Sequence, residues 1–224
     1  MPRMKAVFSK LCPDAPEFSA ATNIRISDGQ GTLRMTYPVK LAMTGDFMRQ
    51  EFDATKMSQM PTEERANLKL AHLDQIVVIT RGDKKTVCIV FPGVQCYCEY
   101  SIPAEVLNEV TTRPKAVTIQ KTELGSATVN ERSCTKTKLT ASEPNRPTEE
   151  AILWSPTDMP QFPIKMEIYA KQGTTTFDFQ DVSVKKPNAT MFEVPPNYIQ
   201  FSSPNAILAY AKEKLNGGGN VAPK

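Results

Sequence analysis

Cysteines are the residues whose spacing most suggests chemistry in this sequence. Three of the five, Cys88, Cys96 and Cys98, crowd into residues 86–100, while Cys12 and Cys134 lie elsewhere. Crowded thiols can form a metal site, a redox pair, a disulfide or part of a packed core. A zinc site normally needs four close ligands, whereas one strand presents two thiols about 6–7 Å apart. We favour packing, and keep one disulfide and a metal or redox site as alternatives.

The other residues that could do chemistry are isolated from one another. His72, the one histidine, cannot form a paired metal motif, and we interpret it as an exposed or capping residue. Arg81-Gly82-Asp83 matches an adhesion tripeptide, but its place between two predicted strands favours a turn. The sequence contains no nucleophile elbow, phosphate loop or dinucleotide fingerprint. We therefore expect no catalytic residue, metal site or cofactor, and a protein that is not an enzyme.

Composition indicates a soluble globular chain with a sizeable core. Of 224 residues, 40% are hydrophobic and 23% charged, which is ordinary for this class. The 27 basic residues are interspersed with 24 acidic ones, for a net charge of +3. Nucleic acid needs a concentrated basic surface, so it is not the expected partner. No apolar run approaches the roughly 18 residues that span a bilayer, so we expect no membrane-spanning segment.

Strict alternation dominates the first half of the chain. In TLRMTYPVKLAM, residues 32–43, the apolar side chains occupy the odd positions, which predicts a strand with one buried face. These six residues are Leu33, Met35, Tyr37, Val39, Leu41 and Met43. The preceding residues 18–27 alternate in the same way, and residues 28–31 form the turn between the two strands. After a turn at residues 44–46, Met48 and Phe52 can share a face of the next strand, 47–53.

The rest of the chain adds further short strands and few helices. Residues 61–75 predict a helix, and residues 102–110 fit a short second one. Ser203 and Pro204 predict the start of a C-terminal helix, about 204–216. The remaining strands are expected at 75–80, 86–91, 94–100, 116–124, 134–139, 150–154, 163–170 and 174–184. We expect a single domain over residues 1–224, with a sheet core at about 18–201 and a flexible tail at 217–224.

Some eleven strands with two or three helices pose a packing problem, because so few helices cannot cover a flat sheet of that size. A strongly curved antiparallel sheet that wraps partly around the helices resolves it, and it leaves an apolar cavity between them. The predicted fold is therefore mainly β (α+β): one strongly curved antiparallel sheet, an incomplete barrel lidded by a few helices.

Four short stretches are the most specific marks of a resemblance that covers roughly Phe18 to Phe201: Met48-Arg49, residues 124–129 with Cys134, residues 154–163, and residues 192–196. With these stretches the sequence resembles a bacterial exported family of unknown function, related to the outer-membrane lipoprotein carriers of the LolA and LolB-like superfamily. The resemblance implies a lipoprotein-carrier-like half-barrel around a hydrophobic cavity for acyl chains. It also implies export to the periplasm or another extracytoplasmic site, although a signal peptide is absent from this sequence.

Two functions follow as hypotheses. The first is a noncatalytic, monomeric carrier or sensor that binds a lipid or a lipoprotein acyl chain. Its expected ligand-binding residues are Met35, Tyr37, Leu41, Met43, Met48 and Phe52. The alternative is a structural or interaction module of the cell envelope, whose partner is an envelope protein and which has no small ligand. An enzyme remains as a third class that no residue pattern demands.

Overall fold

A single sheet dominates the structure, a computed structural model that describes residue 8 and residues 17–103, 118–142 and 148–216. Its order is β12-β6-β5-β4-β3-β2-β1-β11-β10-β9-β8-β7. The strands are β1 (Glu17–Asp28), β2 (Leu33–Thr44), β3 (Phe47–Asp53), β4 (Gln75–Arg81), β5 (Thr86–Phe91), β6 (Cys96–Ser101), β7 (Thr118–Val129), β8 (Arg132–Ser142), β9 (Glu149–Pro156), β10 (Lys165–Ala170), β11 (Gly173–Ser183) and β12 (Ile199–Phe201).

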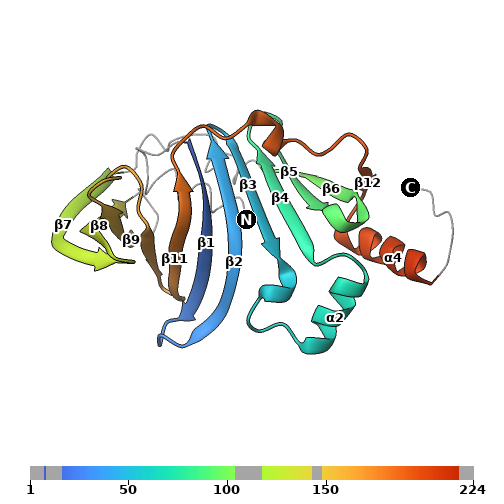
Figure 1. Cartoon of the computed structure of the whole chain (residues 1–224), viewed down its shortest axis with the longest axis horizontal. Coiled ribbons are helices and arrows are strands. Elements are labelled where there is room, and N and C mark those ends of the chain that lie inside the picture. Colours follow the sequence, from blue (N-terminus) through green and yellow to red (C-terminus); the bar gives the residue numbers. More distant parts are fainter. Residues whose placement is uncertain (1–7, 9–16, 104–117, 143–147, 217–224) are drawn as a thin grey trace.

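The sheet is curved and stays open. Its end strands, β7 and β12, lie at opposite ends of the molecule (Figure 1). Strand pairing is antiparallel throughout except between β12 and β6, which run parallel. The prediction of a mainly β, antiparallel, incomplete barrel with few helices is confirmed.

One face of the sheet, which we call the inner face, carries the main core. It is the face of Phe18, Leu41, Met43 and Met48, which are joined there by side chains from β8 to β11. Phe8, ahead of β1, is fully buried among them, with ring centroids 5.5 Å from Phe18. As the alternation predicts, β1 and β2 each bury their apolar side on the inner face.

The alternation fails at one residue of β2. A register shift after Ile26 leaves Leu33 opposite Ser27, and Leu33 is 52% exposed. The expectation that all six apolar residues of residues 32–43 share the helix-facing side is therefore wrong for Leu33. A bulge inserts one extra residue, which shifts the strand beyond it out of phase.

The opposite, outer face is covered in part by a return segment of the chain. The short 3-10 helix η3 (Ala189–Phe192) places Phe192 against Val77, Ile79 and Cys88. Arg81 fixes this segment by hydrogen bonds to the carbonyl of Phe192 and to the carboxylate of Glu193. As a result β4 is buried on both faces, which explains the unbroken apolar run of residues 76–79.

Two helices cover one end of the inner face. The helix α4 (Pro204–Leu215) occupies the predicted C-terminal segment, and the Ser203 hydroxyl accepts a hydrogen bond from the Ala206 amide. Its residues Ile207 and Tyr210 pack against Cys96 and Cys98. The other helix, α2, contributes Leu68 to the same cluster.

The helix α2 (Thr62–Leu70) is shorter than the predicted span of 61–75. His72 adopts a left-handed φ of 53°, and the amide of Leu73 donates to the carbonyl of Leu68. This is the Schellman arrangement that ends a helix, and Leu68 and Leu73 pack in one cluster as it requires. Sequence analysis missed it because glycine, the usual residue at this position, is absent.

Three expectations lie outside the described residues. They are the helix over residues 102–110 beyond residue 103, the role of Cys12, and the flexible tail at 217–224. They stay predictions.

Candidate functional site

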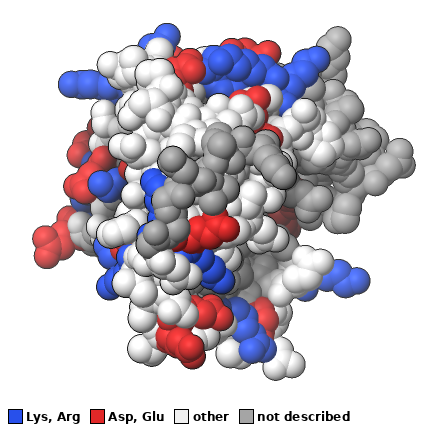
Figure 2. Space-filling view, turned by 90° about the vertical axis from the view of Figure 1, so that its right-hand side faces the viewer, with Lys and Arg blue, Asp and Glu red and all other residues white. Residues whose placement is uncertain are grey.

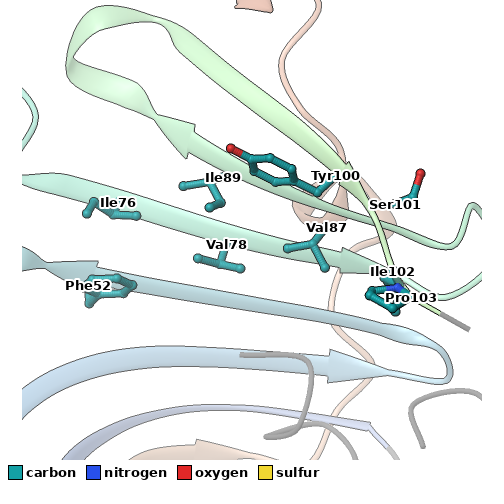
Figure 3. A pocket seen from close by; sticks show the side chains of 9 residues that line it. All are labelled: Phe52, Ile76, Val78, Val87, Ile89, Tyr100, Ser101, Ile102 and Pro103. Carbon is teal, nitrogen blue, oxygen red and sulfur yellow. The ribbon is translucent and has the colours of Figure 1, made fainter. Parts of the chain in front are cut away.

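An apolar pocket of about 410 Å³ opens on the inner face over β3 to β6. Its wall is almost wholly apolar, and the side chains lie on one side of the strands (Figure 3). The lining residues are Phe52, Ile76, Val78, Val87, Ile89, Tyr100, Ser101, Ile102 and Pro103. A wall of this kind fits an apolar ligand, and the volume lies in the range of about 300–1,000 Å³ typical of small-molecule pockets.

Strand register brings these side chains together. Phe52 lies opposite Ile76, Val78 opposite Ile89, and Val87 opposite Tyr100. Residues that pair across antiparallel strands share a face, so three cross-strand pairs build one continuous apolar surface. Beyond β6 the amide of Ile102 donates to the carbonyl of Lys85, and Ile102 and Pro103 complete the lining.

Polar groups in the lining are few. Tyr100 is 37% exposed, and its pKa is raised, chiefly by a hydrogen bond with Cys98 and also by burial. The phenol is therefore neutral at pH 7, and it is the one ionisable side chain among the described lining residues. The described lining residues offer no charge to pair with a charged ligand group.

The other hollows differ in chemistry. One of about 280 Å³ and one of about 210 Å³ lie beside β1 to β3, and Lys40 and Glu51 line both. Figure 2 shows basic and acidic side chains interspersed on the side of the molecule that it presents. Of these three hollows among the described residues, the apolar pocket is the one suited to an uncharged chain.

The six residues expected to bind a ligand lie in three different places. Phe52 lines the pocket, and the ring of Tyr37 packs 6.2 Å from it, edge to face. Met35 lies further along β2, opposite Ile26. Leu41, Met43 and Met48 are buried in the core around Phe18. The structure thus places one of the six, Phe52, in the pocket lining, with Tyr37 packed against it, and ligand contact by any of the six stays a prediction.

Sequence analysis missed most of the lining. Ile76, Val78, Val87 and Ile89 belong to strands whose apolar residues run on without alternation, because both faces are buried there. Alternation cannot assign a face to such residues. The signal that could have found them is the register with β3, once Phe52 is placed on the inner face.

The four described cysteines are free and buried. Cys96 and Cys98 pack under α4, as the favoured interpretation predicts, whereas Cys88 lies on the outer face with its thiol 3.3 Å from Glu99 Oε2. Burial is the main cause that raises the pKa of Cys88 to about 12, and the neighbouring Glu99 carboxylate adds to the shift.

Cys134 packs with Trp154 and Ile164. In the described part of the chain the four thiols form no disulfide, and no three His, Cys, Asp or Glu residues gather as a metal site.

The remaining motif residues have structural roles. His72 is exposed and lies at the end of α2, as expected. Arg81 and Asp83 bind each other, with Arg81 Nη2 2.8 Å from Asp83 Oδ2, and the intervening Gly82 donates to the carbonyl of Asp46. Neither helix of the described residues has the length and apolar character needed to cross a bilayer.

Similarity to known proteins is found among solved structures. No protein-family model matches the chain, and no curated protein is similar to it in sequence. The structure is similar to that of a LolA superfamily protein from Nitrosomonas europaea, at 9% identity over 83% of this chain and 96% of the other, with a TM-score of 0.39. Lipoprotein LppX of Mycobacterium tuberculosis matches at 13% identity, with coverage of 83% and 98% and a TM-score of 0.45. LprF from Mycobacterium bovis matches at 14%, with coverage of 84% and 96% and a TM-score of 0.42.

Proposed function

We propose that this protein is a noncatalytic carrier or sensor that binds one acyl chain of a lipid or lipoprotein in the pocket over β3 to β6. The observation that carries the proposal is the almost wholly apolar wall of a pocket of about 410 Å³. Each methylene group that leaves water for such a wall contributes about 0.8 kcal/mol. A charged headgroup has no partner there and would stay outside.

Among the residues expected from the sequence, Phe52 is the one proposed to contact the ligand directly. The ring of Tyr37 packs against the ring of Phe52. Val78, Val87 and Ile89 complete the contact surface. Leu41, Met43 and Met48 form the packed wall next to it and set how far the ligand can enter. A location outside the cytoplasm belongs to the same proposal and rests on the resemblance to exported carriers.

Native mass spectrometry of the purified protein, followed by lipid extraction, tests this function. We expect an added mass that matches an acyl lipid and disappears after delipidation, together with saturable uptake of a fluorescent fatty-acid ester. A protein that carries no lipid and takes up no fluorescent acyl probe at micromolar concentration would disprove the proposal.

An envelope interaction module is the second candidate, and one observation favours it. The strand β7 is the last of the sheet, none of its residues is buried, and Leu124 is 47% exposed. An open strand edge can add a strand from a partner protein. Capture of an envelope protein that is lost on Thr122→Pro, with no lipid bound, would favour this function over the first.

A further inference from the structure

Two polar side chains, Gln50 and Thr80, are buried on the inner face next to the pocket. Gln50 of β3 is 2% exposed and lies between Met48 and Phe52 along its side of the strand. Thr80 of β4 is 0% exposed and follows Val78 on the same side. Polar groups buried in apolar surroundings are normally retained only with hydrogen-bond partners.

These two side chains are neighbours. Thr80 lies directly opposite Met48, and Gln50 directly opposite Val78, so Gln50 and Thr80 are on the diagonal of the pairing. Diagonal neighbours on one face are about 7–8 Å apart, which lets the long Gln50 side chain approach the Thr80 hydroxyl. One small oxygen-bearing group could therefore contact both.

Their hydrogen bonding within the protein is weak. Among the described residues, the Thr80 hydroxyl has no hydrogen-bond partner. Gln50 Nε2 is 4.0 Å from Met48 Sδ, and a thioether is a weak acceptor. A buried hydroxyl with no partner destabilises a protein, so its presence requires an explanation.

The pair lies next to the pocket, although neither residue belongs to its lining. Thr80 is opposite Val87 on β5 and two residues beyond Val78 on β4, and both valines line the pocket. On the other side, Met48 belongs to the packed core. A ligand that extends along β4 by one further side-chain position would reach the Thr80 hydroxyl once the side chains that bury it move aside.

We propose that Thr80 and Gln50 bind a neutral carbonyl oxygen of the ligand, the ester or amide carbonyl at which an acyl chain is linked. This inference rests on the proposed function. A hydroxyl and a primary amide both donate hydrogen bonds, which suits an acceptor oxygen. An ionised carboxylate would enter apolar surroundings with no basic residue in the described lining, so a free fatty acid is disfavoured against an ester.

Competition between two ligands tests this assignment. Methyl dodecanoate and tetradecane have chains of similar length and differ in the ester group, and each displaces bound N-phenyl-1-naphthylamine, a neutral fluorophore. We expect Thr80→Val, which removes only the hydroxyl, to weaken the ester about five- to tenfold, as loss of one hydrogen bond implies. Tetradecane should bind the variant as well as it binds the wild type.

Thr22→Val is the matched control, because Thr22 is also a buried threonine of the inner face, but it lies opposite Val39 away from the pocket. It should leave both ligands unaffected. If Thr80→Val and wild type show the same ester-to-alkane preference, the assignment is wrong and the proposed function stands. If neither ligand nor fluorophore binds wild-type protein, the proposed function itself fails.

Stability supplies an independent readout. Without ligand, Thr80→Val should unfold at a temperature at least as high as that of wild type, because valine removes a buried hydroxyl that has no partner. A clear fall in unfolding temperature would show that the hydroxyl has a partner in the free protein, which would overturn the assignment.

Discussion

Met48 of β3 lies directly opposite Thr80 of β4, and this pair marks the boundary between packed core and open pocket. Met48 is fully buried in the cluster around Phe18, whereas the neighbours of Thr80 on its other sides, Val78 and Val87, line the pocket. The inner face therefore has two parts with different responses to substitution. Changes on the Met48 side test stability, and changes on the pocket side test binding.

Met43 belongs to the stability side, so Met43→Glu should unfold the protein. Met43 is 2% exposed and pairs with Phe18 and Met48 across its two neighbouring strands. A buried carboxylate without a partner costs several kcal/mol, roughly, against a total stability of about 5–15 kcal/mol. Circular dichroism and urea unfolding measure the loss.

Leu33→Glu is the control for Met43→Glu, because it puts the same side chain on the exposed end of the same strand. It should change stability by no more than about 0.5 kcal/mol. A folded Met43→Glu protein of native stability would show that the core opens at this point, and acyl uptake by that variant would then need to be measured.

Val87→Trp should block ligand uptake without unfolding the protein. Val87 is half-buried and lines the pocket, so a larger side chain can occupy the space that the ligand needs. We expect uptake of a fluorescent acyl ester to fall at least about tenfold, or about 1.4 kcal/mol. Thr128→Trp, a substitution of another β-branched residue at an exposed position of β7, should bind normally. Equal uptake by the two variants would place the ligand elsewhere.

The sequence predicted the first three strands well because each has one buried face. On β1 and β2 the alternation of Phe18, Ala20 and Leu41 with polar residues reflects that geometry directly. On β4 the run of residues 76–79 conceals which side chains face the pocket, because Phe192 returns from more than a hundred residues away to cover the outer face. The run indicates burial on both faces, but it does not show which side chains face the pocket.

The candidate site was predicted less well than the fold. Phe52 was found because it shares the alternation of β3, but Tyr100 and Val87 required the pairing of β5 with β6. Phe8 joins the core from outside any predicted element, so no periodicity marks it. The end of α2 was misplaced because His72 takes a left-handed backbone conformation that residues other than glycine rarely adopt.

The buried thiols should resist alkylation in the folded protein. Burial is the first cause that raises the pKa values of Cys88, Cys96, Cys98 and Cys134, and the thiolate is the reactive form. Iodoacetamide at pH 8 should therefore leave these four unlabelled in native protein and label all four in guanidinium without a reductant. Peptide mass spectrometry measures each site, and a thiol that needs reduction before labelling would reveal a disulfide.

Acid should remove the stability that the ion pair between Asp83 and Arg81 contributes. Hydrogen bonding to Arg81 lowers the pKa of Asp83 to about 2, from an ordinary value of 3.8. A depressed pKa adds stability above pH 3.8, and this stability disappears as the pH falls through about 2. The side chain is 44% exposed, so we expect less than about 1 kcal/mol. Asp83→Asn should be less stable than wild type at pH 7 and equal to it near pH 2. A constant difference over this range would exclude the ion pair as the cause.

Gly93 is required by the close approach of two backbone segments at the end of the inner face. It lies in the 3-10 turn η2 (Pro92–Val94), and an added Cβ would come 2.3 Å from the carbonyl oxygen of His72. Because that neighbour is backbone at the end of α2, the clash cannot be relieved by a rotamer change. Gly93→Ala should therefore lower the free energy of unfolding by about 1–3 kcal/mol, the usual effect of overpacking.

Gly29→Ala is the matched control for Gly93→Ala. The nearest atom to a Cβ at Gly29 is 3.7 Å away, an ordinary contact, so its stability should be close to that of wild type. Since His72 links α2 to the cluster beneath α4, Gly93→Ala should also increase amide exchange at Ala71 and Leu73, which belong to that cluster. Urea unfolding and hydrogen exchange measure the two effects. Equal stability of the two alanine variants would mean that the turn moves away from His72 at little cost.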